Sequence, residues 1–456
     1  MAPKTAELAS RHQLLHFTDM QAEVPVIVRG DGFRVYDESG RGYIDGLSGL
    51  YCTNLGHSFG DELGAIAHAQ MKELAFVSNW TLAHPRSAEL SAKIASLAPE
   101  GLNRVFFTSG GSESVEAAWK MARQYHAANG EPQRRKAIAR RYAYHGVTLG
   151  ALSFTGIPVC RAPFEPLAVP CHHVSNTNAY RHPQGDDPEA MTAALLAELE
   201  EAIEFETPEQ VAMVIAEPVQ NAGGCIPPPP GYWQGLREIC DRHGILLCSD
   251  EVICAWGRLG EWFGAQKFDY VPDLLTFAKG LTSAHAAMGG VLIHDRVAEP
   301  FMKGEMYMHG MTFGGHPVGS AIALGAIEIM EREGVLDNVR ANAPHVQARL
   351  EGLLDIPIVG DVRGVGYFWA LELVKNPETK ETFEGAEADW LLGDILSDRM
   401  RSNGLICRLD DRSDPAVQLA PPLVGGAAMW DEIIDIVQDG LRYASDRIAE
   451  APAHAG

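Results

Sequence analysis

The chain has 456 residues, of which 46% are hydrophobic and 21% charged, and its formal net charge is −23. This composition is typical of globular proteins, and a chain of this length can bury a large core. The acidity argues against a nucleic acid or an anionic membrane as partner, because both carry negative charge themselves.

The cysteines and the N-terminus indicate the cellular setting. The eight cysteines form no CxxC pair, so a disulfide framework is not expected and a reducing compartment fits better. "CHH" (171–173) lacks a matching distant pair of ligands, which favours a surface loop over a metal site. "MAPKTAELASRHQ" has no apolar signal-peptide core, and no apolar run is long enough to span a membrane. We therefore expect a soluble cytoplasmic protein without a bound metal.

The predicted elements begin in residues 24–50, whose alternating pattern and DG and SG turns are typical of antiparallel strands. The middle of the chain then alternates short apolar runs with helical periodicity. This predicts a mostly parallel sheet with helices on both faces. The strands expected there are residues 104–109, 210–219, 244–252, 272–281 and 289–294, and the helices between them include 110–129 and 233–243.

Beyond the middle region, a long helical stretch begins at about residue 320, "GSAIALGAIEIMEREGVLDNV", and a short strand is expected at 364–374. The sequence shows neither an internal repeat nor a low-complexity linker. We predict a large domain from residues 56–319 and a small α+β domain that combines residues 1–55 with residues 320–456.

Polar residues follow the predicted parallel strands where these end, which is where open α/β sheets bind ligands. "FFTSGGSES" opens a helix at Gly110 and Gly111, which Ser112 can cap, so its N–H groups can bind an anion. "LLCSDEV" ends in Asp250 and Glu251, whose side chains point to opposite faces, so one of them faces the expected pocket. An ordinary glycine turn and a solvated strand end would give the same patterns.

Three further segments carry polar groups that also occur in plain turns and packing. "AEPV" places Glu217 after another strand, and alone it suggests a structural role. "YAYHG" places Tyr144 and His145 in a loop after a charged helical stretch. "MYMHGMTFGGHP" is a glycine-rich segment with Thr312, and such segments can hold phosphate.

Lys279 ends the buried strand of "PDLLTFAKGL". A lysine there usually extends to solvent. Here, however, an anion-binding loop, an aromatic residue, a carboxylate and a lysine follow one another along the chain, and pyridoxal phosphate needs all four. Its phosphate binds N–H groups, its ring stacks on an aromatic side chain, its ring nitrogen pairs with a carboxylate and its aldehyde binds a lysine. The 29 residues from Asp250 to Lys279 fit one helical crossover between strands.

These motifs resemble those of the class III aminotransferases, which belong to fold type I of the pyridoxal-phosphate enzymes. The resemblance covers nearly the whole chain and is nearest to the ω-amino acid/amine:pyruvate transaminases. It implies an α/β fold whose large domain has a mostly parallel seven-stranded sheet between helices. It also implies a homodimer with shared active sites, or a tetramer built from it. The matching segments are "GLYCTNLGH", "FFTSGGSESVE", "YHG", "AEPVQNAGG", "SDEVICAWGRLGEWF", "LLTFAKGLTSAHAAMGG", "HGMTFGGHPVG" and "NGLICR".

The resemblance assigns roles to individual positions. Lys279 would bind the aldehyde, Asp250 would pair with the ring nitrogen, and Tyr144 would stack on the ring, as the three catalytic residues. The other cofactor residues implied are Gly111 and Ser112 at the phosphate, His145 beside Tyr144, Val252 beneath the ring, Glu217 near the cofactor oxygen, and Thr312 at the phosphate of the neighbouring subunit's cofactor.

For the substrate, the resemblance implies Tyr51 in "GLYC" as one pocket wall, where many relatives carry tryptophan, and Trp80 as a second wall. Arg408 matches a mobile arginine that binds a carboxylate. The segment after it, "LDDRSDPAVQLAPPL", is longer than expected for this branch. Arg412 is therefore a rival for the same task.

The implied activity is transfer of an amino group from a primary amine or ω-amino acid to a keto acid, with pyruvate expected, by a ping-pong mechanism. Two alternatives stay open. One is an aminomutase on the same scaffold, which needs no separate acceptor. The other is an NAD-type dehydrogenase on a doubly wound sheet, although "SGGSES" lacks the GxGxxG pattern. The sequence does not choose the physiological amine.

Overall fold

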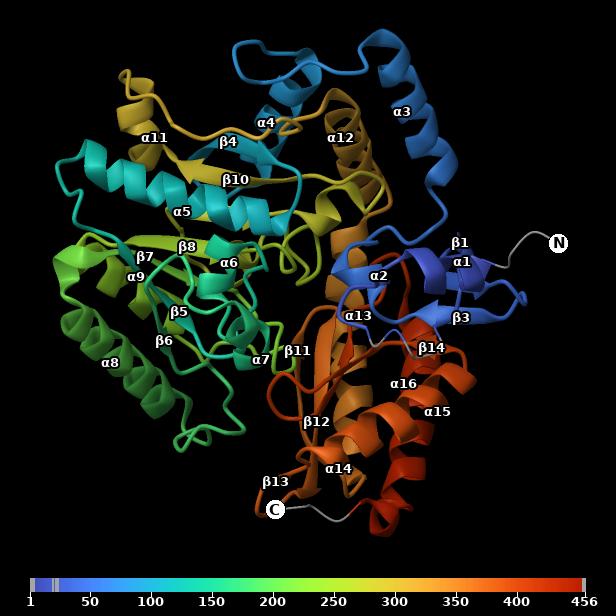
Figure 1. Cartoon of the computed structure of the whole chain (residues 1–456). Helices are drawn as coiled ribbons and strands as arrows, with labels where there is room; N and C mark the ends of the chain where they lie inside the picture. Colours follow the sequence, from blue (N-terminus) through green and yellow to red (C-terminus); the bar gives the residue numbers. More distant parts are fainter. Residues whose placement is uncertain (1–4, 19, 21–23, 453–456) are drawn as a thin grey trace.

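Seven strands form the largest sheet of the computed structural model, which describes residues 5–18, 20 and 24–452. In space the order is β4-β10-β9-β8-β7-β5-β6 (Figure 1). The five strands from β9 to β6 run parallel, whereas β10 is antiparallel to both of its neighbours. The predicted mostly parallel sheet is thus confirmed. The strands are β4 (Leu102–Thr108), β5 (Lys136–Arg140), β6 (Cys171–Val174), β7 (Val211–Ala216), β8 (Leu246–Asp250), β9 (Leu274–Phe277) and β10 (Gly289–His294).

Helices cover both faces of this sheet. Side chains alternate between the two faces along each strand, so an apolar strand must be covered on either side. In β9, for example, Leu274 packs into one apolar cluster, whereas Leu275 and Phe277 pack into another on the opposite face. The first cluster includes residues of α5 (Gly111–Ala128), α6 (Leu149–Phe154) and α11 (Asp295–Met302). The second includes residues of α4 (Pro85–Leu97), α8 (Pro188–Glu206), α9 (Tyr232–His243) and α12 (Pro317–Arg332).

Three predictions about the connections in this region are wrong. The charged stretch before Tyr144 is β5, because Ala137, Ile138 and Ala139 are buried between neighbouring strands. "CHH" is not a surface loop but part of the edge strand β6. The connection from Asp250 to β9, which leads to Lys279, contains only the single helical turn α10 (Gly264–Lys267), and the rest of it consists of turns and loops.

The two ends of the chain meet in a second region (Figure 1). β1 (Ile27–Asp31), β2 (Arg34–Asp37) and β3 (Gly42–Asp45) are antiparallel, as predicted, and β14 (Leu405–Ile406) joins β3 in parallel. A further sheet has the order β11-β12-β16-β15, with β13 beside β12. Its strands are β11 (Val359–Val365), β12 (Phe368–Asn376), β13 (Glu381–Thr382), β15 (Arg408–Asp410) and β16 (Ala416–Leu419). The single strand expected at 364–374 is instead the end of β11, the turn at residues 366–367 and most of β12.

The long helical stretch is interrupted where Gly334 adopts a left-handed backbone, with φ of 60°. It therefore forms two helices, α12 and α13 (Val335–Glu351), instead of one. The predicted domain boundary between residues 319 and 320 falls inside α12, and the domain division stays a prediction. The remaining helices are α1 (Thr5–His12), α2 (Ser48–Tyr51), α3 (Gly60–Glu73), α7 (Pro158–Arg161), α14 (Ala386–Asp389), the π-helical η5 (Trp390–Ser397), α15 (Asp398–Ser402) and α16 (Ala427–Ser445), with short 3₁₀ turns η1 (Ala162–Phe164), η2 (Pro208–Gln210), η3 (Lys279–Thr282), η4 (Gly352–Asp355) and η6 (Ile448–Glu450).

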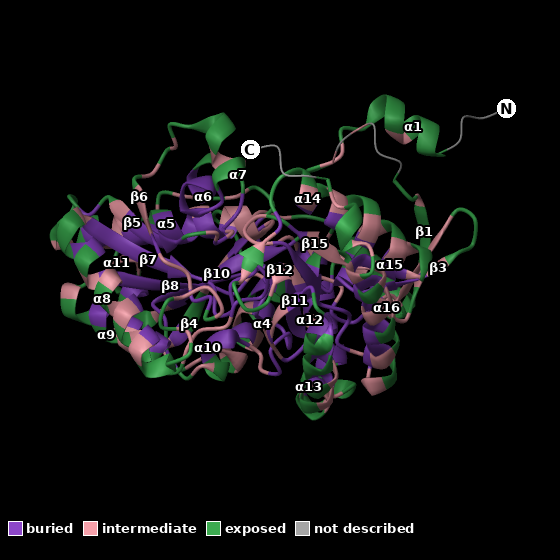
Figure 2. Cartoon of the chain, turned by 90° about the horizontal axis from the view of Figure 1, so that it is seen from below, coloured by how far each residue is buried: buried purple, intermediate pink, exposed green. Residues whose placement is uncertain are grey.

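Burial is deepest in the central strands, and β7 is buried along its whole length, whereas α1 has no buried residue (Figure 2). Within the described ranges, no helix is both long and apolar enough to cross a membrane. The eight cysteines are all free. The part of the chain that the structure describes contains no group of three or more His, Cys, Asp or Glu side chains arranged to hold a metal ion.

Candidate active site

A cavity of about 230 Å³ lies where β8 and β9 end and α5 begins. Side chains from segments far apart in the sequence border it, because the parallel strands bring their carboxyl ends to the same edge of the sheet. The sequence-predicted residues that line it are Gly111, Ser112, Tyr144, His145, Glu217, Asp250, Val252 and Lys279.

Lys279 projects into this cavity from the second position after β9 and is half-buried. Its φ is 44°, a conformation that costs a side-chain-bearing residue roughly 1–2 kcal/mol. Gly280 follows because a Cβ there would lie 2.3 Å from Nδ2 of Asn54. Burial lowers the pKa of the Lys279 amine, and the negative charge of Asp250 partly opposes this. The amine is thus more easily deprotonated than that of a surface lysine.

Three donors fix the carboxylate of Asp250. Thr276, its neighbour on β9, donates from Oγ1 to Oδ1 over 3.0 Å. The backbone N–H of Val252 donates to the same oxygen over 3.2 Å, and Nδ1 of His145 lies 2.7 Å from Oδ2. Nε2 of His145 is buried and has no hydrogen-bond partner within the described residues. Because a carboxylate only accepts hydrogen bonds, Nδ1–H of His145 is the donor to Asp250.

Glu251 points to the opposite face of the sheet, as the alternation of strand side chains predicts. It is buried rather than solvated, and it accepts the N–H groups of Gly264 and Ala265 over 2.5 and 2.7 Å. Burial raises its pKa to about 7. Of the two adjacent carboxylates, only Asp250 borders the cavity.

The start of α5 has unpaired N–H groups, which an anion site needs, but no serine cap. Gly110 occupies the cap position without a side-chain hydrogen bond, and Ser112 instead accepts the N–H of Val147 over 3.2 Å. The N–H groups of residues 111–113 donate to no acceptor in the described part of the chain. A Cβ at Gly111 would lie 3.0 Å from Cγ1 of Val252, which explains the glycine. These N–H groups and the helix dipole suit a phosphate.

Glu217 and Tyr144 border the cavity together. The backbone N–H of Tyr144 donates to Oε1 of Glu217 over 3.2 Å, and that of Asn221 donates to Oε2 over 2.9 Å. Burial raises the pKa of the Glu217 carboxyl and that of the Tyr144 hydroxyl. Both side chains therefore favour their neutral forms more than exposed ones would.

Several predicted residues do not line this cavity. Trp80 borders a separate hollow of about 720 Å³ together with residues 306–311, and Thr312 follows directly in an exposed position. Tyr51 is only 2% exposed, and its neighbour Leu50 forms the cavity wall instead. Arg408 and Arg412 lie outside the lining as well.

Sequence reasoning missed Thr276, although a signal was present. It is the one polar side chain in the otherwise apolar run "LLTFA", and it faces the strand that ends in Asp250. Ile253 and Cys254 also line the cavity. They lie in turns after β8, whose path no local pattern predicts.

The residues of the cavity fit pyridoxal phosphate. A partly desolvated lysine amine and a hydrogen-bonded carboxylate border one small space, and the start of α5, with its unpaired N–H groups, borders the same space through Gly111 and Ser112. The sheet order and this site define a pyridoxal-phosphate-dependent transferase of fold type I.

The comparisons with known proteins name the family. The model of the class-III aminotransferases matches residues 18–441, and the chain belongs to this family. It is 49% identical over 439 residues to a probable aminotransferase of Mycobacterium tuberculosis, covering 96% of this chain and 94% of that protein. It is 38% identical over 440 residues to the putrescine–pyruvate aminotransferase of Pseudomonas aeruginosa, covering 95% of each.

A solved structure shows the same fold. The thermostable (S)-enantioselective omega-transaminase from Thermomicrobium roseum superposes with a TM-score of 0.91 at 39% identity, covering 96% of this chain and 98% of that one. The protein is thus a transaminase that uses pyridoxal phosphate, and the dehydrogenase alternative is wrong.

Proposed function

We propose that this protein is an ω-aminotransferase that transfers the amino group of a primary amine or ω-amino acid to a keto acid, with pyruvate as the acceptor. The placement of Lys279 and Asp250 on one cavity carries the transamination chemistry. The choice of substrates is supported by similarity to the putrescine–pyruvate aminotransferase and the omega-transaminase.

Each residue of the cavity has a separate role in the reaction. Bound pyridoxal phosphate supplies an electron sink for the charge that develops at the donor carbon. Lys279 removes and returns the proton at that carbon, because its lowered pKa leaves more of the amine in the basic form. When the cofactor is bound, Asp250 would hold a negative charge against the ring nitrogen, and Tyr144 would cover the ring. The N–H groups at the start of α5 and Ser112 would hold the phosphate.

Initial-rate kinetics with putrescine and pyruvate test this proposal. One site serves both substrates in turn, so we expect parallel lines in double-reciprocal plots and, without pyruvate, no more than one equivalent of carbonyl product per site. Intersecting lines would contradict the ping-pong order. Turnover of an amine without any acceptor would instead support an aminomutase.

We also propose that the protein is a homodimer, or a tetramer built from it, in which Thr312 reaches the cofactor phosphate of the neighbouring subunit. Exposed apolar side chains support this, since Trp80, Met308 and Phe313 are 66%, 76% and 61% exposed around the 720 Å³ hollow and the segment that follows it. Sedimentation equilibrium is expected to give at least twice the mass of the chain, and the mass of a single chain would exclude shared sites.

We also propose that the protein is located in the cytoplasm. Eight free cysteines suit a reducing compartment.

A further inference from the structure

Arg258 is fully buried in the connection between β8 and β9, and its guanidinium binds three segments that are distant in the sequence. Nη1 donates to the carbonyls of Tyr367 and Pro421 over 3.1 and 2.6 Å. Nη2 donates to Oγ of Ser48 over 3.1 Å and to Oδ1 of Asn54 over 3.0 Å. This side chain therefore joins the β8–β9 connection to the N-terminal and C-terminal parts of the chain.

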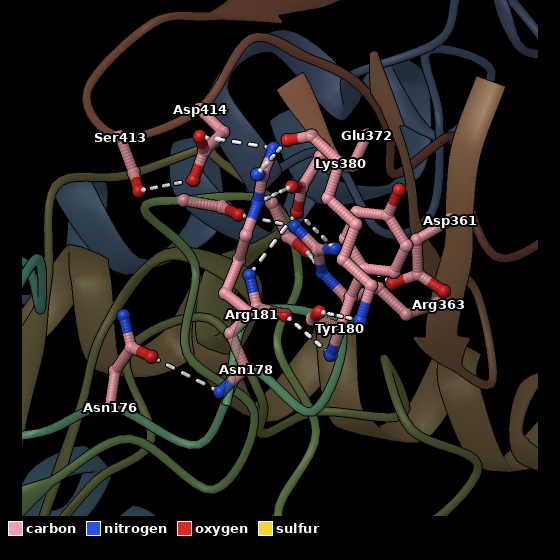
Figure 3. Close-up of polar contacts among 12 residues, drawn as sticks. Asn176, Asn178, Tyr180, Arg181, Asp361, Arg363, Glu372, Lys380, Ser413 and Asp414 are labelled. Atoms are coloured by element: carbon pink, nitrogen blue, oxygen red, sulfur yellow. Dashed lines mark hydrogen bonds and ion pairs between the residues drawn. The ribbon is translucent and has the colours of Figure 1, made fainter. Parts of the chain in front are cut away.

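Arg258 lacks ion pairs of the kind that hold Arg363. That arginine is also buried, but it binds Asp361 over 2.8 Å and Glu372 over 2.5 Å, and Glu372 in turn binds Arg181 (Figure 3). In the described part of the chain no carboxylate lies within ion-pair distance of Arg258, and burial lowers its pKa to about 10. A buried charge without a counter-charge is costly, so Arg258 depends on its four neutral acceptors.

Asn54, one of these acceptors, lies between Arg258 and the turn that carries Lys279. Its Oδ1 accepts from Arg258, and its Nδ2 donates to the carbonyl of Trp256 over 2.9 Å, so both ends of the amide are fixed. The same amide packs against Gly280, where an added Cβ would lie 2.3 Å from Nδ2 and 3.0 Å from Cγ of Asn54. Asn54 thus fills the space beside the residue that follows Lys279.

Leu55, the next residue, holds the other end of this turn. The turn η3 begins at Lys279, and Ser283 follows it with a left-handed backbone, at φ of 46°. Oγ of Ser283 accepts the N–H of Leu55 over 2.9 Å. Residues 54–55 therefore contact the turn at both ends. Lys279 has a φ of 44°, and such a conformation persists only where the surrounding structure imposes it.

We propose that Asn54, held by Arg258, is a positioning residue for Lys279: its amide packs against Gly280 and keeps the turn in the conformation that directs the lysine amine into the cavity. Neither Asn54 nor Arg258 lines the cavity, so their effect on the reaction is indirect. This inference rests on the proposed role of Lys279 as the base that moves the proton.

A size exchange between Asn54 and Gly280 in the holoenzyme tests the contact. Gly280 is not left-handed, so alanine is disfavoured there only by its methyl group. We expect kcat to fall about 10²-fold in Asn54→Ala and in Gly280→Ala, the loss that a displacement of about 1 Å can cause, while KM for putrescine changes roughly tenfold less.

The double variant Asn54→Ala/Gly280→Ala should recover part of this loss. Its new methyl group enters the space that the amide leaves, and the next atom, Cβ of Trp256 at 3.1 Å, has to shift only slightly. We expect kcat roughly tenfold above that of Gly280→Ala alone, because substitutions of residues in contact are not additive. A double variant no faster than Gly280→Ala would overturn the proposal.

Amide hydrogen exchange measures the hold on the turn without any turnover. The N–H groups of Leu281, Ser283 and His285 donate to carbonyls of residues 278–282 over 3.0 to 3.1 Å. Their exchange should be roughly tenfold faster in Asn54→Ala, because the turn opens more often. Faster exchange with an unchanged kcat would show that the reaction does not depend on this contact.

Asn338→Ala is the matched control. Nδ2 of Asn338 donates to the carbonyls of Leu423 and Gly425 over 2.7 and 2.9 Å, so its loss also weakens contacts of the C-terminal part of the chain, but none of these bonds involves the turn. Its kcat and its exchange at residues 281–285 should match wild type. An equal loss of kcat in Asn338→Ala and Asn54→Ala would contradict a positioning role.

Putrescine deuterated at its amine-bearing carbons shows which step has slowed. A displaced base slows removal of the proton, so kcat of Asn54→Ala should fall with an isotope effect no smaller than that of wild type. A smaller isotope effect would show that another step had slowed, and it would exclude the proposed role.

Two variants keep the test decisive if Asn54→Ala is poorly folded. Gly280→Ala leaves Asn54 and Arg258 in place, and a kcat like that of wild type would overturn the proposal. Arg258→Lys keeps the charge but cannot reach all four acceptors, so its kcat should lie below wild type. Failure of the role of Lys279 itself looks different, since borohydride would then fix no cofactor on residue 279 of the wild-type protein.

Discussion

Replacing Lys279 by alanine is expected to lower turnover of putrescine and pyruvate by about 10⁴-fold or more, while the protein stays folded. The substitution removes the only lysine among the described residues that line the cavity and with it the base that moves the proton, a contribution of about 10²–10⁴-fold by itself. Covalent attachment of the cofactor is lost as well. Alanine at φ of 44° keeps the backbone cost, but the variant no longer desolvates an amine, so we expect no loss of stability.

The measurement combines initial rates with the mass of the borohydride-treated protein. In wild type, reduction should leave the cofactor attached to the peptide that contains residue 279, and in Lys279→Ala no peptide should carry it. Lys267→Ala is the matched control, because Lys267 is an exposed lysine on α10 in the same β8–β9 connection. Turnover retained by Lys279→Ala, or a cofactor fixed on another lysine, would remove Lys279 from its role.

Replacing Asp250 by asparagine is expected to cost about 10²–10³-fold in turnover, the usual loss when one fixed charge partner is removed from an active site. The shape of the side chain is kept. Its oxygen can still accept from Thr276 and Val252, and its amide can donate to Nδ1 of His145 once the proton of that ring moves to Nε2. The loss of turnover would therefore measure the effect of the missing negative charge and not that of a disrupted site.

The pH dependence of the bound cofactor's absorption measures this charge directly. Without the Asp250 carboxylate, the ring nitrogen should lose its proton at a lower pH than in wild type, because an opposite charge favours the protonated form. An absorption titration that is identical in Asp250→Asn and wild type would show that this carboxylate does not contact the ring nitrogen.

Glu251→Gln is the matched control, because it changes the adjacent carboxylate on the opposite face of the sheet. We expect turnover close to wild type but a changed pH dependence of stability. The pKa of Glu251 is raised from 4.5 to about 7 in the folded protein, so the folded state binds more protons than the unfolded state between these values. Wild-type stability from this group therefore falls as pH rises through this window, and the variant should lack that fall in its unfolding temperature.

Much of the catalytic centre was predictable because its signals are local. Three short patterns carry these signals: glycines before a helix, paired acids after an apolar strand, and a lysine after another apolar strand. Each pattern spans about ten residues of sequence. The sheet then places the carboxyl ends of its parallel strands at one edge, so a correct list of these strand ends already predicts the members of the site. Gly111, Asp250 and Lys279 border one cavity for this reason.

Other features required pairings between distant segments. β5 has three arginines and a lysine in it or directly beside it, so its sequence resembles that of a charged helix. It forms a strand because it is buried between β6 and β7. The support that Thr276 gives Asp250 depends on the register of β8 against β9.

The sequence by itself determined the chemistry of this protein, because the glycines, the aromatic residue, the acid and the lysine follow one another along the chain and together supply what pyridoxal phosphate needs. The tertiary structure alone decided which arginine stands fixed near the cavity. Arg412 is held by Asp410 two residues away, but the hairpin that carries both is held by Arg181 and Glu372, which lie far from it and from each other in the chain. Long-range ion pairs of this kind leave no periodic pattern in a sequence, since any charged residue can find its partner only after the chain has folded.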